Sequence, residues 1–198
     1  DVGTYTISND NLTYGNNYTE NFVSGTLTIT TKAVTVMANA QTKDFGDVDP
    51  SLTYTSSPEI GTSLSNGDTI SYTGSLTRTL GENVGTYPIS IGTLTNTNYD
   101  LTFTPADLTI TKLAVTVIPT ASQSKTYGDS DFTLAYTASP DVSTTLTNTT
   151  STVTFTGSLS RTTGENVNDY TINIGTLTNT NYDITLSPET FAINKKTI

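Results

Sequence analysis

Apolar residues alternate with threonine or serine along most of this chain. The segments with this pattern lie at residues 33–38, 51–57, 69–79, 86–95 and 99–111. A period of two places successive side chains on opposite faces of a strand, and the chain shows no comparable helical period. Between these segments lie short stretches rich in Gly, Asn and Asp, as tight turns require: "FGDVDP", "SNGD", "LGENVG" and "TNTN". The pattern predicts an all-β chain of short strands.

The same pattern returns after about 80 residues, which indicates tandem repeats. "KDFGDVDPSLTYTSSP" at 43–58 returns as "KTYGDSDFTLAYTASP" at 125–140, and "DVGTYTI" at 1–7 corresponds to "NVGTYPI" at 83–89. We therefore expect four segments: 1–32 as the C-terminal part of a preceding repeat, 33–112 and 113–195 as two complete β domains, and 196–198 as the start of the next repeat.

Each complete repeat is expected to form a small antiparallel β-sandwich of Ig-like type, because it contains several short strands separated by turn signals. Within 69–79 we expect Ile70, Tyr72 and Leu76 to face inward and Gly74 to mark a bulge or a close backbone approach. The joins "LTITTKAVTV" and "LTITKLAVTV" contain no glycine, proline or Ser-rich spacer. The domains are therefore expected to lie end to end.

One stretch of ten residues, "IGTLTNTNYD", occurs twice without change, at 91–100 and at 174–183. It is either a repeated binding site or a repeated piece of scaffold. Ile91, Leu94 and Tyr99 surround the polar "TNTN" segment, so the stretch predicts a hairpin. Asparagine favours turns without needing any ligand, and the scaffold interpretation is therefore preferred.

The composition excludes several kinds of chemistry. The 198 residues include no histidine, no cysteine and no tryptophan, which removes the commonest general base, the usual zinc ligands, thiolate nucleophiles and disulfides. Threonine fills 47 positions, about a quarter, and suits half-exposed strands. No pair of carboxylates is flanked by apolar residues in the manner of an acid–base pair. The chain is therefore not expected to be an enzyme.

The charge balance is strongly acidic, with a formal net charge of −10. Such a surface repels nucleic acid and anionic membranes, so no nucleic-acid partner is expected. No apolar run approaches the length of a membrane span, and no membrane insertion is expected. The first residues, "DVGTYTISND", are not a signal peptide, which suggests an interior piece of a longer protein.

Several motifs together resemble a known family. They are "YGD" at 127–129 with "FGD" at 45–47, then "GSLTRTLGENVGTY" at 74–87 and "GTLTNTNYDLTF" at 92–103. This set resembles the MBG repeat, a YGX-type, mostly-β module found in tandem in very large bacterial surface adhesins and haemagglutinin-like proteins. The resemblance covers both complete repeats and the N-terminal fragment. Phe45 replaces the tyrosine of the motif and "NVNDY" at 166–170 replaces "NVGTY", differences that concern local turn geometry.

The resemblance implies a structural role outside the cell. The chain would be a stalk or filament repeat of a large secreted adhesin at the cell surface, of an attachment or gliding type. Its partners would be neighbouring repeats of the same chain and, beyond them, a distal adhesive domain with its surface or glycan target.

The alternative is a repeat that itself binds glycan or protein ligands through its loops. Tyr54, Tyr72, Tyr87 and Tyr99 would offer a stacking platform if they were exposed together and coplanar. The alternation places most tyrosines on inward faces, which favours the structural role.

The two arginines, Arg78 and Arg161, occupy the same repeat position, and each precedes an acid by four residues, Glu82 and Glu165. A guanidinium can grip a carboxylate or a sugar through its planar fork. It can equally pin the "GENV" loop through an ion pair or through turn carbonyls, and we expect this second role.

The acidic loops carry five candidate calcium ligands: Asp44, Asp47, Asp49, Asp129 and Asp131. Calcium requires six or more oxygen ligands. The second repeat lacks one of these carboxylates, because Thr126 aligns with Asp44, and no complete calcium-loop motif is present. Turn capping is the favoured role, and no cofactor is expected.

Lys32, Lys112 and Lys195 close their repeats at equivalent positions. A lysine of this kind can form an isopeptide bond with asparagine if burial lowers its pKa, since only the neutral amine attacks. The exit of a last strand is a poor place for such burial, so we expect these lysines to be polar markers of the domain joints.

Overall fold

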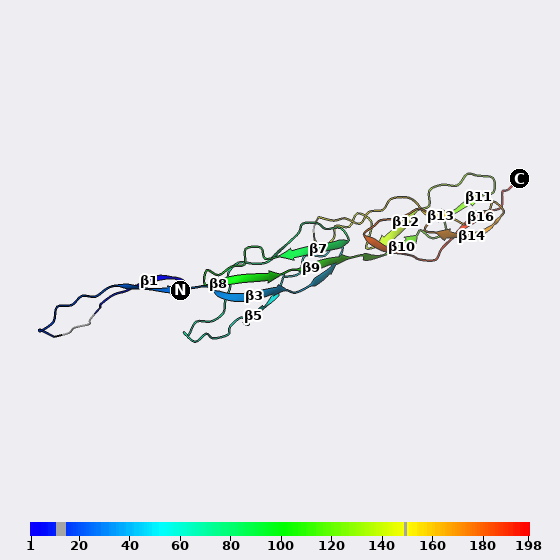
Figure 1. Ribbon diagram of the computed structural model, residues 1–198. Coiled ribbons are helices and arrows are strands. Elements are labelled where there is room, and N and C mark those ends of the chain that lie inside the picture. The colour runs from blue at the N-terminus through cyan, green and yellow to red at the C-terminus, as the bar shows by residue number, and fades with distance from the viewer. Residues whose placement is uncertain (11–14, 149) are drawn as a thin grey trace. The chain divides into compact units, whose positions relative to one another are not determined.

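The regular elements of the described residues, 1–10, 15–148 and 150–198, are all β-strands in this computed structural model (Figure 1). The all-β prediction is confirmed. The strands are β1 (Gly3–Ile7), β2 (Gly25–Ile29), β3 (Lys32–Ala38), β4 (Gln41–Asp44), β5 (Tyr54–Ser57), β6 (Thr77–Arg78), β7 (Gly85–Ser90), β8 (Tyr99–Thr104), β9 (Ala106–Thr111), β10 (Leu113–Pro119), β11 (Ser124–Thr126), β12 (Tyr136–Ser139), β13 (Ser160–Arg161), β14 (Asn168–Asn173), β15 (Tyr182–Leu186) and β16 (Thr190–Asn194). Within the described residues there is no helix long and apolar enough to cross a membrane.

The second repeat folds into two sheets that share one core. Their strand orders are β12-β10-β15 and β11-β16-β14-β13. Val117 of β10 belongs to the same buried cluster as Ile172 of β14 and Phe191 of β16. Side chains from both sheets therefore meet, as in a β-sandwich.

The pairing within this sandwich is mixed. β10 pairs with β15 in parallel, from Leu113↔Tyr182 to Val117↔Leu186, and β11 pairs with β16 in parallel. The other pairs of the repeat, β10–β12, β13–β14 and β14–β16, are antiparallel. This differs from the purely antiparallel sandwich that we expected. Alternation decides which face of a strand is buried, but it does not decide which strand lies beside it or in which direction.

The first repeat has the same pairings. β3 lies between β5, its antiparallel neighbour, and β8, its parallel neighbour (Figure 1). β4 pairs with β9 in parallel, and β6 pairs with β7 antiparallel. The N-terminal fragment forms the antiparallel pair β1–β2, with Gly3 opposite Ile29 and Ile7 opposite Gly25.

The compact units of the chain do not follow the repeat boundaries. One unit contains Asp1–Asn39, Leu52–Thr79 and Pro88–Ala106, and the other contains Ala40–Ser51, Leu80–Tyr87 and Asp107–Ile198. The second unit therefore holds the whole second repeat. From the first repeat it holds residues 40–51 with β4, residues 80–87 with the start of β7, and nearly all of β9. Contacts between these parts of the two repeats belong to the interior of this one unit.

The repeated decapeptide is not a hairpin. In the second repeat β14 and β15 lie in different sheets, so residues 174–181 cross from one sheet to the other. Two turns carry the chain across, closed by Leu177 N to Ile174 O (3.1 Å) and Tyr182 N to Asn179 O (3.2 Å). Leu177 between them is buried in the core, which explains its apolar character without a strand.

Residues 69–79 follow the prediction at the level of burial. Ile70 and Leu76 are buried and Tyr72 is half-buried, although regular strand is limited to Thr77–Arg78. Gly74 has φ +86°, and a Cβ there would lie 2.1 Å from the carbonyl oxygen of Thr93. The expected close backbone approach at this glycine is confirmed.

Candidate functional site

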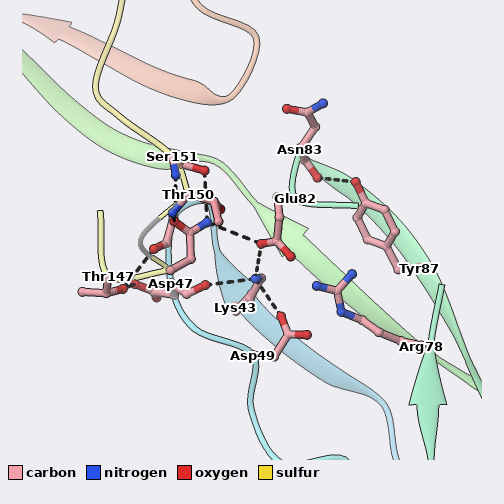
Figure 2. A network of polar contacts seen from close by, with 12 residues as sticks. Lys43, Asp47, Asp49, Arg78, Glu82, Asn83, Tyr87, Thr147, Thr150 and Ser151 are labelled. Carbon is pink, nitrogen blue, oxygen red and sulfur yellow. Dashed lines mark hydrogen bonds and ion pairs between the residues drawn. The ribbon is translucent and has the colours of Figure 1, made fainter. Parts of the chain in front are cut away.

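A buried lysine forms the centre of an ion cluster in the first repeat (Figure 2). The alternation of β4 turns Lys43 inward, and its side chain is only 3% exposed. Its ammonium donates to Asp49 Oδ1 (2.7 Å), Glu82 Oε2 (2.6 Å) and the carbonyl oxygen of Asp47 (2.9 Å). These three acceptors match the three N–H bonds of an ammonium group. Burial is the largest single influence and lowers the pKa of Lys43, but the hydrogen bonds to Asp49 and Glu82, together with the negative charges of these acids, raise the pKa overall.

The second repeat builds the same cluster around Lys125. The ammonium lies 2.6 Å from Asp131 Oδ1 and 2.5 Å from Glu165 Oε2. The hydrogen bond to Asp131, followed by that to Glu165, raises the pKa of Lys125. The pKa of the Asp131 carboxyl is lowered, first by Arg161 and then by Lys125, and the pKa of Glu165 is lowered first by Lys125 and then by Arg161. Every member of the cluster is thus held in its charged form.

Arg161 uses all its hydrogen-bond donors within this cluster. Its Nε and Nη2 bind the two carboxylate oxygens of Asp131 at 2.8 and 3.0 Å, and Nη2 also donates to Glu165. Its Nη1 donates to the carbonyl oxygens of Thr162 (3.1 Å) and Gly164 (2.6 Å). A guanidinium has five N–H bonds, and all five are satisfied here. The structure thus places Arg161 on its own "GENV" loop, with no donor left for a ligand.

Arg78 lies at the equivalent position of the first repeat and donates through Nη1 to the carbonyl oxygen of Thr79 at 2.9 Å. This matches the bond from Arg161 to Thr162. Glu82, the acid four residues further on, binds Lys43.

The sequence did not reveal the two lysines at the centres of these clusters. Lys43 and Lys125 occupy the same repeat position, and each has an acid six residues later, Asp49 and Asp131. That shared spacing was the available signal. It was missed because a charged residue within a strand is usually exposed.

The carboxylates of four of the five candidate calcium ligands contact protein groups, and Asp129 takes part in a turn through its main chain. Asp49 and Asp131 bind the buried lysines, and Asp44 accepts a hydrogen bond from the Thr111 hydroxyl at 2.5 Å. Asp47 Oδ1 lies 3.3 Å from the Thr147 hydroxyl, and the Asp129 amide closes a turn on Thr126 O. The part of the chain that the structure describes contains no group of three acidic side chains placed to hold a metal ion.

The three lysines that close the repeats, Lys32, Lys112 and Lys195, are exposed. The buried lysines are instead Lys43 and Lys125. Their raised pKa values keep them protonated, which opposes the nucleophilic attack that an isopeptide bond requires.

The tyrosines do not form a stacking platform. The rings of Tyr54 and Tyr72 meet at 77°, and those of Tyr72 and Tyr99 at 65°, both edge to face. All three are half-buried, as is Tyr87, whose hydroxyl donates to Asn83 O. A flat ligand needs an exposed ring face, and edge-to-face packing covers these faces with neighbouring rings.

One hollow of about 500 Å³ lies on the second repeat beside the Arg161 cluster. Phe132 forms part of its wall with a half-exposed ring, packed 5.5 Å from the buried ring of Phe191. The first repeat has Pro50 in place of Phe132, so this aromatic wall is specific to the second repeat. This hollow is a candidate ligand site.

A second constellation lies where the two repeats meet inside the second compact unit, and Asn181 forms its polar half. Its side-chain oxygen accepts the amide N–H of Val84 (2.9 Å), and its side-chain nitrogen donates to Asn83 Oδ1 (3.0 Å). One asparagine of the second repeat therefore binds the "NV" loop of the first. Its main-chain oxygen also accepts from the amide of Leu113, the first residue of β10.

The apolar half of this joint is a core drawn from both repeats. The rings of Phe45 and Tyr182 pack edge to face at 5.8 Å, and both are buried. Val84 and Leu146 pack against the same cluster. The Tyr182 hydroxyl is satisfied within its own repeat, because it accepts from Thr154 N and donates to Thr152 O.

A loop of the second repeat closes the joint over Gly46. The carbonyl oxygen of Gly46 accepts from the Thr147 hydroxyl (2.9 Å) and from the amide of Asn148 (2.7 Å). Gly46 has φ +91°, and a Cβ there would lie 2.2 Å from Leu146 Cδ1. Only glycine combines this backbone with so close an approach.

The polar half of the joint recurs within the first compact unit. Asn98 Oδ1 accepts from the amide of Val2 (2.9 Å), and Asn98 Nδ2 donates to Asp1 Oδ1 (3.0 Å). Asn98 and Asn181 occupy the same place in the repeated decapeptide, and Tyr99 and Tyr182 follow them. The decapeptide is therefore repeated scaffold: in each repeat its asparagine forms hydrogen bonds with the segment before that repeat.

Comparison with known proteins agrees with this organisation. A family described as MBG domain (YGX type) matches residues 34–109 and 115–192, one match within each complete repeat. No curated protein matches the chain, and no solved structure does.

Proposed function

The chain belongs to the MBG domain (YGX type) family, and on this premise we propose that it is a stalk segment of a large secreted bacterial adhesin. Domains of this family are found in surface adhesin-like proteins. In this proposal the repeats lie outside the cell, at its surface, and extend a distal adhesive domain towards a surface or glycan target. Attachment and gliding adhesins are the parent proteins in which such a segment would serve.

The joint inside the second compact unit carries the proposal. A single residue, Lys112, separates β9 from β10, and the two repeats share a buried cluster around Phe45 and Tyr182. Asn181 adds two hydrogen bonds to the "NV" loop. A stalk must transmit force without folding back, and a short connection with a shared core provides that property better than a flexible linker.

The remaining features are compatible with a structural role. The net charge of −10 would keep neighbouring stalks apart and disfavours nucleic acid and membrane as partners. The proposal includes no catalytic activity and no resident metal.

The absence of cysteine allows a direct test of joint rigidity. Thr42→Cys in β4 and Ser124→Cys in β11 place one spin label at the corresponding exposed position of each repeat, both within the second compact unit. Double electron–electron resonance should give one narrow distance distribution, because a shared core allows few orientations. A broad distribution, similar to that of a variant with a Gly-Ser spacer after Lys112, would rule out a stiff stalk.

One observation favours ligand binding as a second candidate function. The hollow beside Phe132 is open and combines a half-exposed aromatic ring with serine and threonine hydroxyls, a composition suited to a sugar. Binding to a glycan array that is lost in Phe132→Ala, while the melting temperature is unchanged, would support this candidate. Absence of binding to any glycan would rule out this candidate and leave the stalk role as the proposed function.

A further inference from the structure

The second repeat carries, at its own "YGD" and "GENV" loops, the residues that the first repeat uses to form the joint. We call Tyr127, Gly128, Asn166 and Val167 the far face. They correspond in the repeat to residues that lie in the joint: Phe45, Gly46, Asn83 and Val84.

The far face is uncovered, whereas its counterpart is covered. Tyr127 is 50% exposed and Phe45 only 7%. A Cβ on Gly128 would meet nothing within 4 Å, whereas a Cβ on Gly46 would overlap Leu146. Val167 is 44% exposed, and Val84 is half-buried against the shared cluster.

The far face is also hollowed. Tyr127, Asn166 and Val167 line a depression of about 570 Å³ together with Lys195, Lys196 and Ile198. The backbone is already shaped for docking, because Gly128 has φ +92° where Gly46 has +91°. The two apolar side chains exposed here are those whose counterparts, Phe45 and Val84, pack in the cluster shared with the next repeat.

We propose that the far face is the docking surface for one further MBG repeat. The joint defines what that repeat must present. It needs a tyrosine like Tyr182 to pack edge to face on Tyr127, and an asparagine like Asn181 to bridge Asn166 and the Val167 amide. It also needs a loop like 146–148 to cap the Gly128 carbonyl. A glycan or an unrelated protein would not supply these three elements at this spacing. Such docking is independent of whether a row of repeats acts as a stalk.

A chain extended by one repeat tests this assignment. Ile198 lies 83 residues after Val115, and the two copies of the decapeptide are also 83 residues apart. Ile198 therefore occupies the same repeat position as Val115. A second copy of residues 116–195 can therefore be joined directly after Ile198. In the extended chain the Val167 amide should become strongly protected from hydrogen exchange, because it acquires the acceptor that Val84 has in Asn181.

Matched glycine variants distinguish a repeat that docks on the far face from one that is only linked covalently to the chain. Gly46→Ala and Gly128→Ala impose the same backbone strain, since the two φ angles agree within a degree. In the present chain Gly46→Ala should lower the melting temperature considerably more than Gly128→Ala, because only Gly46 faces Leu146. In the extended chain the two variants should lower it equally.

Two results would overturn the docking assignment. One is a Gly128→Ala effect and a Val167 exchange rate that are the same in the present and the extended chain. The other is a stable dimer of the present chain that Tyr127→Ser dissociates, because the occupant would then be a second copy of this chain. Tyr127→Ser keeps the test valid if a glycine variant fails to fold, since its side chain is half exposed.

Discussion

At the scale of single residues, two buried lysines account for much of the local order of the loops. Lys43 and Lys125 each gather two acids from different loops, one after "FGD" or "YGD" and one in "GENV". A buried ion pair stabilises only when its partners are well satisfied, and here every ammonium proton of Lys43 has an acceptor. The clusters therefore fix loop positions more than they add net stability.

The charge state of the second cluster predicts acid sensitivity. The pKa values of Asp131 and Glu165 are lowered from 3.8 and 4.5 in the folded protein. A lowered carboxyl pKa contributes stability that is present above the unfolded pKa and is lost as the pH falls through the folded pKa. The melting temperature should therefore fall as the pH drops below 4.5.

Asp131→Asn should weaken this acid dependence, because one of the two titrating carboxyls is removed. It should also lower the melting temperature at neutral pH. Asp183→Asn, at an exposed position of β15, serves as the control and should leave both quantities unchanged. The account would fail if Asp131→Asn and the control had the same melting curve at every pH.

Lys43 and Lys125 also allow a test by mass. Each lies against a carboxylate, but the raised lysine pKa values favour ion pairs over amide formation. The intact mass should therefore equal the mass calculated from the sequence. A deficit of one water or one ammonia per repeat would reveal isopeptide bonds and contradict the ion-pair description.

At the scale of elements, the sequence was sufficient to predict the strands and the buried face of each strand, but not which strands pair with one another. Val34, Val36, Val115 and Val117 alternate with exposed residues as predicted. The decapeptide was predicted to be a hairpin because its polar "TNTN" segment looks like one turn. It makes two turns and changes sheets, because Leu177 enters the core between them. Strand order depends on pairings between distant segments, such as β10 with β15, which local patterns do not encode.

The site could be predicted only in part for the same reason. The loop role of Arg161 was expected from its neighbour Glu165, which lies four residues away. The role of Asn181 depends on residues 97 and 98 positions earlier, Val84 and Asn83. The exact repetition of the decapeptide was the one sequence signal that pointed to Asn181.

Asn181 should be the most sensitive polar residue of the joint. Asn181→Ala leaves the Val84 amide without its acceptor, and an unsatisfied, partly buried N–H costs about 1–3 kcal/mol. Thermal or urea unfolding should show a loss of this size. Thr180→Ala, at the exposed neighbouring position, should change the free energy of unfolding by less than ~0.5 kcal/mol. Equal effects of the two substitutions would remove Asn181 from the joint.

At the scale of the whole molecule, the repeated sequence produces equivalent contacts between successive repeats. Each complete repeat binds the segment before it through one asparagine, Asn98 or Asn181, and in the joint between the two complete repeats Tyr182 also packs on Phe45. The first complete repeat offers a glycine-containing loop and an "NV" loop to the repeat after it, and we propose the same for the second. A module with two complementary ends can be added in series, and length can then change without a new interface.

The proposed stalk role requires consecutive repeats to lie end to end, and small-angle scattering on the 198-residue chain tests this requirement most directly. A compact fold of this length would have a radius of gyration of about 16 Å. We predict a value well above this, and greater flexibility in a variant with a Gly-Ser spacer after Lys112. A radius near 16 Å for the unmodified chain would mean that the domains fold back on each other, and it would contradict the stalk.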